Sequence, residues 1–208
     1  MTRQPTKRSS SVTVWGLLEV GAMVGGLPLR NGKVVEVGES EVPSIAATIE
    51  VGGRNVFLLG THPLPPASAA YARLRNEQFR EIAAQVRRCA MPAIVLGDLN
   101  STPWSPYFKE LLRDSGLQNA SQGRGLFGSW PAWMPLMRIP LDHCLASPSI
   151  RINNMRLGPG IGSDHLPLVV DVQIPMLDTK NGQAQSPEVN SDEQRFSPNR
   201  ATSSKCNS

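Results

Sequence analysis

The chain has few residues of the kinds that build metal clusters or disulfide-rich scaffolds. Its 208 residues include three cysteines and three histidines. The cysteines, Cys89, Cys144 and Cys206, are odd in number and lack the spacing of a zinc site, so they indicate neither a disulfide framework nor a zinc centre. Cysteine usage of this kind makes a reducing compartment the default, and we expect the cytoplasm.

The sequence also has no long apolar run without interruptions. Its most apolar stretch, residues 12–29, contains Glu19, Pro28 and several glycines. These residues argue against a membrane-spanning helix, which needs about 20 apolar residues. We expect one or two core strands joined by a turn instead. The basic start of the chain is not followed by the apolar core and cleavage site of a signal peptide.

Charge of one sign is not strongly in excess. The formal net charge of +4 is mildly basic and favours an anionic partner only weakly. Part of the excess falls in residues 1–11, which are rich in Ser and Thr and are expected to be flexible. From about residue 178 to residue 208, Ser, Asn, Gln and balanced charges dominate, which predicts a disordered tail. The domain itself is expected over residues 12–177.

The most informative stretch is AIVLGDLN, residues 93–100. Its four apolar residues predict a short strand buried on both faces. Asp98 and Asn100 follow two positions apart, so their side chains can point the same way beyond the strand's carboxyl end, where open α/β sheets bind ligands. A carboxylate suits a hard cation or an attacking water, and an amide can donate to a phosphate oxygen. The alternative is an Asx-turn, in which both side chains only cap backbone groups.

The rest of the chain predicts a mixed α/β fold. A turn is expected at Asn31-Gly32. The strongest hairpin joins two apolar runs across Gly52-Gly53, and it leads into a helix whose arginines are interpreted as a solvated face. The expected elements are the hairpin 42–60, the helices 68–88 and 106–114, a long loop over 117–140, and the strands 141–147 and 167–172.

All three histidines stand beside an expected strand end. His62 follows the second strand of the hairpin, and the other two occur in the pairs Asp142-His143 and Asp164-His165. Each histidine taken alone is explained more simply as a hydrogen-bonded structural residue. Three such placements would seldom arise at random.

Four short segments, in their order along the chain, resemble the C-terminal half of the endonuclease/exonuclease/phosphatase superfamily. They are Thr61-His62-Pro63, Gly97-Asp98-Leu99-Asn100, Leu141-Asp142-His143 and Gly162-Ser163-Asp164-His165-Leu166-Pro167. This superfamily includes DNase I, exonuclease III-type abasic endonucleases and inositol phosphatases. The segments Ser129-Trp130-Pro131 and Ile139-Pro140-Leu141-Asp142-His143 are most similar to its bacterial YafD-like branch. The resemblance runs from about Val24 to Val172 and implies a DNase I-like two-sheet α/β sandwich.

The resemblance further implies a metal-dependent phosphoric ester hydrolase that cleaves a P–O bond with an activated water. Asp164 would help to bind Mg²⁺ or Mn²⁺, and His165 would be the acid/base histidine at the phosphate. Asp142 would orient His165, because a carboxylate fixes the tautomer of the imidazole and raises its basicity. His62 would stabilise the phosphate or the leaving group.

The remaining roles concern the attacking water and one further histidine. Asp98 would orient or deprotonate the water, and Asn100 would hydrogen-bond a phosphate oxygen. Either Asp98 or His165 could take the proton of the water. His143 is expected to be structural.

The same resemblance implies a domain truncated at its N-terminus. The family's first half supplies an early asparagine and a Gln-Glu metal carboxylate, and too few residues precede His62 to form that half. Glu19 superficially resembles the metal-binding glutamate but stands too close to the residues that resemble the middle strands. A missing sheet would expose the inner face of the other, which predicts self-association.

Two functions therefore stand side by side. The first is hydrolysis of a phosphodiester, with nucleic acid among the candidate substrates. The alternative is a catalytically impaired remnant, or a module that binds phosphate or nucleic acid without turnover.

Overall fold

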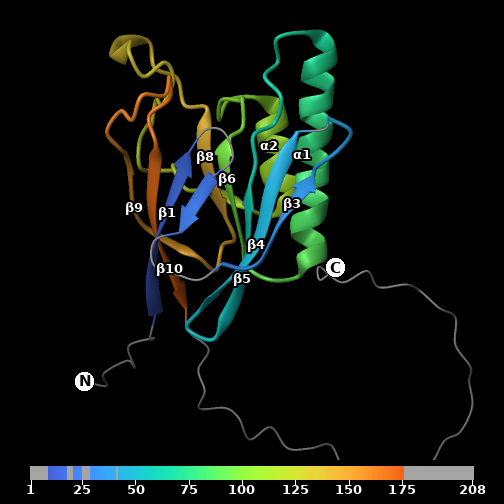
Figure 1. Ribbon diagram of the computed structural model, residues 1–208, viewed down its shortest axis with the longest axis vertical. Helices are drawn as coiled ribbons and strands as arrows, with labels where there is room; N and C mark the ends of the chain where they lie inside the picture. Colours follow the sequence, from blue (N-terminus) through green and yellow to red (C-terminus); the bar gives the residue numbers. More distant parts are fainter. Residues whose placement is uncertain (1–8, 18–20, 25–28, 41, 176–208) are drawn as a thin grey trace, which may run out of the picture.

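Two β-sheets packed face to face form the body of the protein, with two helices on the outer side of the larger sheet (Figure 1). The computed structural model describes residues 9–17, 21–24, 29–40 and 42–175. Residues 1–8, Glu19 and the predicted tail 178–208 lie outside the described residues, and so do residues 176–177 at the end of the expected domain. The DNase I-like two-sheet sandwich is confirmed.

The smaller sheet has four strands and brings the two ends of the domain together. Its order is β2 (Gly21–Val24), β1 (Ser9–Leu17), β10 (Leu168–Pro175) and β9 (Arg151–Leu157). β1 pairs antiparallel with β10 over its length, from Ser9 opposite Pro175 to Gly16 opposite Leu168. β1 and β2 confirm the prediction of strands within residues 12–29.

The larger sheet has six strands and carries most of the predicted site residues. Its order is β3 (Leu29–Glu36), β4 (Pro43–Val51), β5 (Arg54–Gly60), β6 (Ala93–Asp98), β8 (Asp142–Ala146) and β7 (Gln118–Asn119). The predicted hairpin across Gly52-Gly53 is confirmed as β4 and β5. β5 and β6 run parallel, and β6 and β8 run antiparallel.

The helices α1 (Ala69–Cys89) and α2 (Pro106–Ser115) agree with the predicted segments. Ser68 caps α1 by accepting a hydrogen bond from the Tyr71 backbone N–H, and the left-handed Gly116 ends α2. A short 3₁₀ turn, η1 (Pro135–Met137), lies within the long loop over 117–140. None of the helices in the described part of the chain is long and apolar enough to cross a membrane.

The central strands are buried on both faces because successive side chains point to opposite sides of the sheet. Val56 and Leu58 of β5 join a core between the two sheets, whereas Phe57 and Leu59 join a core beneath α1 and α2. The inter-sheet core includes Leu168, Val170, Val172 and Ile174 of β10. Over the described residues the inner face of the larger sheet is therefore covered, which corrects the expectation of an exposed sheet face.

Three local predictions need correction. Asn31-Gly32 is not a hairpin turn, because it lies inside β3, where the register with β4 shifts between Arg30 and Lys33 and Asn31 takes a left-handed φ of 52°. Arg75 of α1 is buried rather than part of a solvated face. β9 was not expected, since its sequence RINNMRL is mostly polar and only Met155 is fully buried.

Candidate active site

The predicted site residues meet at one edge of the larger sheet. β5 and β6 are parallel, so their carboxyl ends lie at the same edge, and His62 and Asp98 stand there. β8 runs the other way and begins at that edge, with Asp142 directly opposite Asp98 in the ladder. The loop before β10 contributes Asp164 and His165. The sheet thus gathers residues that are more than a hundred positions apart in the sequence.

A close backbone approach fixes the positions of His62 and Asp98. The Thr61 N–H donates to the Leu96 carbonyl at 2.9 Å. Gly97 has a φ of +140°, and a Cβ at this position would lie 1.9 Å from the Thr61 carbonyl oxygen. Only glycine allows the two chains to come so near. The Gly in the GDLN stretch therefore brings the His62 loop beside Asp98.

Asp98 is the centre of the site. Its side chain is 3% exposed, and its two oxygens have different neighbours. Oδ1 accepts a hydrogen bond from the Asn100 backbone N–H at 2.8 Å, which is the Asx-turn considered as the alternative. Oδ2 lies 3.4 Å from His62 Nε2 and 3.7 Å from His165 Nε2. One oxygen shapes the loop, and the other faces both imidazoles.

Asp142 holds the His165 ring in place. His165 Nδ1 lies 2.7 Å from Asp142 Oδ2. Because an ionised carboxylate can only accept a hydrogen bond, Nδ1 carries the proton and donates it. This contact turns Nε2 toward Asp98, as the predicted orienting role of Asp142 requires.

The pKa values of both histidines are raised above their usual range. The hydrogen bond with Asp98 raises the pKa of His62, and burial opposes it only in part. Burial by itself would lower the pKa of His165, but the hydrogen bond to Asp142 and the charges of Asp142, Asp98 and Asp164 outweigh it. Both imidazoles are therefore protonated to a larger fraction near neutral pH than free histidine.

Asn100 lies at the same edge, but its side-chain amide points elsewhere than predicted. The Asn100 backbone is in the left-handed region, with a φ of 47°. The side-chain Nδ2 donates a hydrogen bond to the Pro63 carbonyl at 2.9 Å. The amide thus ties the loop after β6 to the loop after His62. The expected hydrogen bond to a phosphate oxygen would have to use the second amide hydrogen.

Arg75 is a residue of the site that the sequence interpretation missed. Its Nη1 donates to the Asn100 carbonyl at 2.7 Å, and its Nε and Nη2 donate to Asn76 Oδ1 at 3.2 and 2.9 Å. The guanidinium carbon lies 5.5 Å from the Phe79 ring centre and 6.0 Å from that of Tyr107. Burial lowers the pKa of Arg75. Its position four residues before Phe79, on the apolar stripe of α1, was the signal that could have found it.

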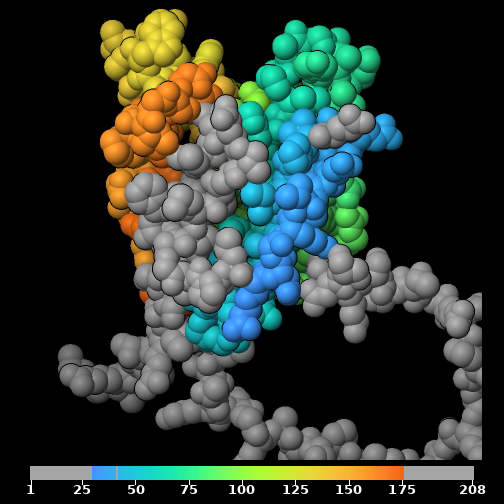
Figure 2. Space-filling model, in the orientation of Figure 1, coloured from blue at the N-terminus to red at the C-terminus, as the bar shows by residue number. Residues whose placement is uncertain are grey.

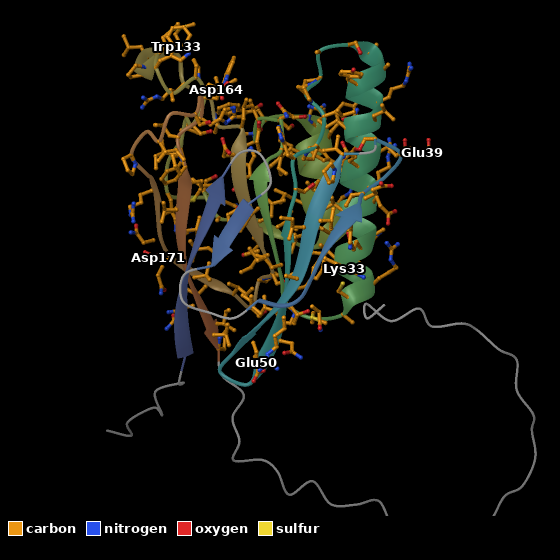
Figure 3. The ribbon with its side chains drawn as sticks, in the orientation of Figure 1. Lys33, Glu39, Glu50, Trp133, Asp164 and Asp171 are labelled. Atoms are coloured by element: carbon orange, nitrogen blue, oxygen red, sulfur yellow. The ribbon has the colours of Figure 1, made fainter. Side chains whose placement is uncertain are left out.

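Asp164 stands apart from the buried cluster. It is exposed in the loop before β10, and its Oδ2 accepts a hydrogen bond from Trp130 Nε1 at 3.2 Å. The Ala132 N–H donates to the Asp164 carbonyl, and the Trp130 and His165 ring centres are 6.3 Å apart. Figure 3 shows Asp164 at the upper edge of the molecule, below the loop that carries Trp133.

The described residues do not form a metal cage. Among residues 9–17, 21–24, 29–40 and 42–175, no group of three or more His, Cys, Asp or Glu side chains is arranged to hold a metal ion. Mg²⁺ is often held by one or two carboxylates together with substrate phosphates. Asp164, exposed beside His165, fits that smaller set.

His143 is set apart from this chemistry. It is 2% exposed, its Nε2 donates to the Ser101 carbonyl at 2.7 Å, and its ring lies 4.5 Å from that of Phe108. Burial lowers the pKa of His143, which favours the neutral ring. These contacts agree with the expected structural role.

Comparison with known proteins adds a family and a fold. The model of the Endonuclease/Exonuclease/phosphatase family matches residues 4–165. The search of curated protein sequences found no match. Similar solved structures include the human Nocturnin catalytic domain with bound sulfate anion, which is 24% identical with a TM-score of 0.57, over 70% of this chain and 59% of that one.

Two further structures show the same fold. An endonuclease/exonuclease/phosphatase from Beutenbergia cavernae is 23% identical with a TM-score of 0.59, over 78% of this chain and 53% of that one. A humanized D. rerio TDP2 is 12% identical with a TM-score of 0.55, over 78% of this chain and 76% of that one. The chain thus spans 53% to 59% of the length of the first two structures.

Proposed function

Because the chain belongs to the endonuclease/exonuclease/phosphatase family, we propose that it hydrolyses a phosphoric ester at the edge where β5, β6 and β8 meet. The observation that carries this proposal is the convergence of two imidazole nitrogens, His62 Nε2 and His165 Nε2, on one buried oxygen, Asp98 Oδ2. A structural hydrogen-bond network would need only one of these contacts. The similarity to the YafD-like branch remains a prediction within this family.

Hydrolysis of a P–O bond needs an activated water and donors for the negative charge that develops. We assign the water to Asp98, because its Oδ2 faces both imidazoles and the raised pKa values of His62 and His165 make each a poorer acceptor of the water's proton at neutral pH than an unperturbed histidine. His165, held by Asp142, donates to a phosphate oxygen. His62, whose side chain is 38% exposed, is the better placed of the two to meet a leaving group from solvent.

We further propose that the reaction depends on Mg²⁺ or Mn²⁺. A divalent cation would neutralise the phosphate charge. Asp164 is the described carboxylate that would hold it, together with oxygens of the substrate. The Trp130 N–H bonded to Asp164 Oδ2 would orient that carboxylate.

The test is hydrolysis of bis(p-nitrophenyl) phosphate with Mg²⁺, with Mn²⁺ and with EDTA. We expect turnover that needs the metal and that falls by about 10²- to 10⁴-fold in His165→Ala, because a general acid–base group typically contributes this much. Asp114→Asn, which changes a partly exposed acid on α2, is the matched control and should keep the parental rate. Equal rates in His165→Ala and the parent would contradict the site assignment.

One observation favours the second function, a module that binds phosphate without turnover. It is the lack of a three-ligand metal group among the described residues. This function predicts affinity for inorganic phosphate or an oligonucleotide without metal and no product in the same assay. Metal-dependent product that disappears in His165→Ala would exclude it.

A further inference from the structure

Two uncharged walls flank the candidate site. Residues 63–72 lead from His62 into α1, and residues 126–137 include Trp130, whose N–H meets Asp164. Neither segment contains an Asp, Glu, Lys or Arg. We name these segments the proline rim, 63–72, and the tryptophan rim, 126–137. Figure 2 shows them as two lobes at the upper edge of the molecule, teal and yellow, with a hollow between them.

The tryptophan rim exposes large apolar side chains at its tip. Trp133 is 71% exposed, Leu136 is 100% exposed and Met137 is 64% exposed. Tyr71, at the end of the proline rim, is 45% exposed. Several large apolar side chains exposed on one loop are typical of an interaction site rather than of an ordinary solvated surface. Figure 3 shows Trp133 at the upper edge of the molecule, above Asp164, so the exposed tip lies on the same side as this site residue.

The residue types in the rims bear on whether the phosphodiester partner is a nucleic acid or a lipid, and they do not favour nucleic acid. Nucleic acid binds mainly through Lys and Arg at its phosphates, and the rims have none. Arg138, the first basic residue after the tryptophan rim, folds back to donate to the Ala132 carbonyl. Single-stranded bases stack on aromatic side chains, but the most exposed residue here, Leu136, is aliphatic.

The exposed residues of the two rims are of the kinds that bind to a lipid surface. Trp side chains prefer the boundary between headgroups and hydrocarbon, and Leu and Met gain free energy by entering the hydrocarbon. Uncharged rims avoid the cost of desolvating charged groups at such a boundary. A phosphodiester headgroup would then enter the site between the rims, beside the exposed Asp164.

We propose that the two rims dock on the surface of a lipid bilayer and that the substrate is a phosphodiester headgroup presented there. This inference rests on the proposed hydrolytic function for its substrate, but the docking itself needs only the exposed rims. Binding and turnover can therefore be measured separately.

The first test is sedimentation of the full chain with vesicles of phosphatidylcholine, without metal. We expect the parent protein to sediment with the vesicles and Leu136→Asp to bind at least about tenfold more weakly, because an apolar contact is replaced by a charge. Val34→Asp is the matched control: Val34 is 68% exposed on the edge strand β3, away from the rims, and this variant should bind like the parent. Leu136 makes no buried contact, so its replacement should leave the unfolding temperature unchanged.

The second test uses Trp133. Its fluorescence should shift to shorter wavelength when vesicles are added, and Trp133→Phe should lose most of that shift. No sedimentation of the parent protein, or equal binding by Leu136→Asp, would overturn the proposal. The proposal would also be overturned if the parent protein binds a fluorescent single-stranded oligonucleotide and Leu136→Asp weakens that binding by about tenfold or more.

The outcomes also separate this inference from the proposed function. His165→Ala should bind vesicles like the parent protein, because its side chain is buried below the rims. Vesicle binding without turnover of bis(p-nitrophenyl) phosphate would support docking and contradict the hydrolytic function. Turnover without vesicle binding would support the hydrolytic function and contradict docking on a lipid bilayer.

Discussion

Asp98 and Asp164 are both acids of the candidate site, but the fold surrounds them differently. Asp98 ends the buried strand β6 and is 3% exposed, with two imidazoles facing one of its oxygens. Asp164 is exposed in a loop, and its side chain meets the indole N–H of Trp130. The groups that could move protons are thus positioned by a packed sheet. The group proposed to meet a cation stands on a loop beside the substrate's approach.

This contrast explains why one half of the site is assembled in the protein alone and the other is not. Rigid strand ends hold side chains at fixed separations without a ligand. Under the proposed metal dependence, the loop carboxylate of Asp164 would complete its environment with oxygens of a bound phosphate around the cation. We therefore expect substitutions on the sheet side to change the stability of the protein even without metal, and those on the loop side to change turnover through the proposed metal.

The largest effect is expected from Asp142→Asn. This change keeps the shape of the side chain but removes the charge that orients His165 and raises its pKa. We expect kcat/KM for bis(p-nitrophenyl) phosphate to fall by about 10²-fold or more. The pH above which activity declines should also move down, since the protonated form of His165 is no longer stabilised. A reduced rate with an unchanged pH profile would contradict the orienting role.

A smaller effect is expected from Arg75→Leu. The change leaves the Asn100 carbonyl and Asn76 Oδ1 without their guanidinium donor, so the free energy of unfolding should fall by about 1–3 kcal/mol. Arg75→Lys keeps a charge but not the planar fork and should recover only part of this loss. Arg80→Leu, at an exposed position of the same helix, is the control and should change stability by less than about 0.5 kcal/mol. Urea unfolding measures the free energy of unfolding of all three variants. An equal loss of this free energy in Arg75→Leu and Arg80→Leu would show that the Arg75 contacts do not stabilise the fold.

The smallest effect is the pH dependence that His62 gives to stability. Its pKa is raised in the folded state, chiefly by the hydrogen bond with Asp98, so its contribution is fully present below the unfolded pKa of about 6.5 and is lost as pH rises through the folded value. Because the side chain is 38% exposed, solvent screening keeps the change below about 1 kcal/mol. Unfolding free energies measured across this range for the parent and for His62→Gln should converge at high pH. Parallel curves would contradict the contact with Asp98.

Much of the fold could be predicted because its signals are local. The hairpin β4–β5 follows from two apolar runs around Gly52-Gly53, and α1 follows from Ser68 and helical spacing of its apolar residues. β9 could not be predicted, since its polar sequence pairs with β10 through backbone hydrogen bonds that leave no alternating pattern. Asn31-Gly32 was misleading because the same dipeptide suits a hairpin turn and a bulge.

In the candidate site, too, some features could be predicted from local sequence and others could not. His62, Asp98, Asp142 and His165 were identified from short segments beside strand ends, and the fold brings them together. Their catalytic roles are still predictions. The contacts of Arg75 with Asn100 and of Trp130 with Asp164 were not predicted, since these partners lie 25 and 34 positions away in the sequence.

The sequence by itself determined the two helices, most of the strands and the polar residues that follow them, because hydrophobic periodicity and turn residues act over a few positions. Only the tertiary structure decided which of these residues touch. It set Asp98 Oδ2 beside His62 and His165, turned the Asn100 amide to Pro63 and buried Arg75 against the loop after β6. These contacts join chain segments that meet only when the sheets pack, so no local pattern could specify them.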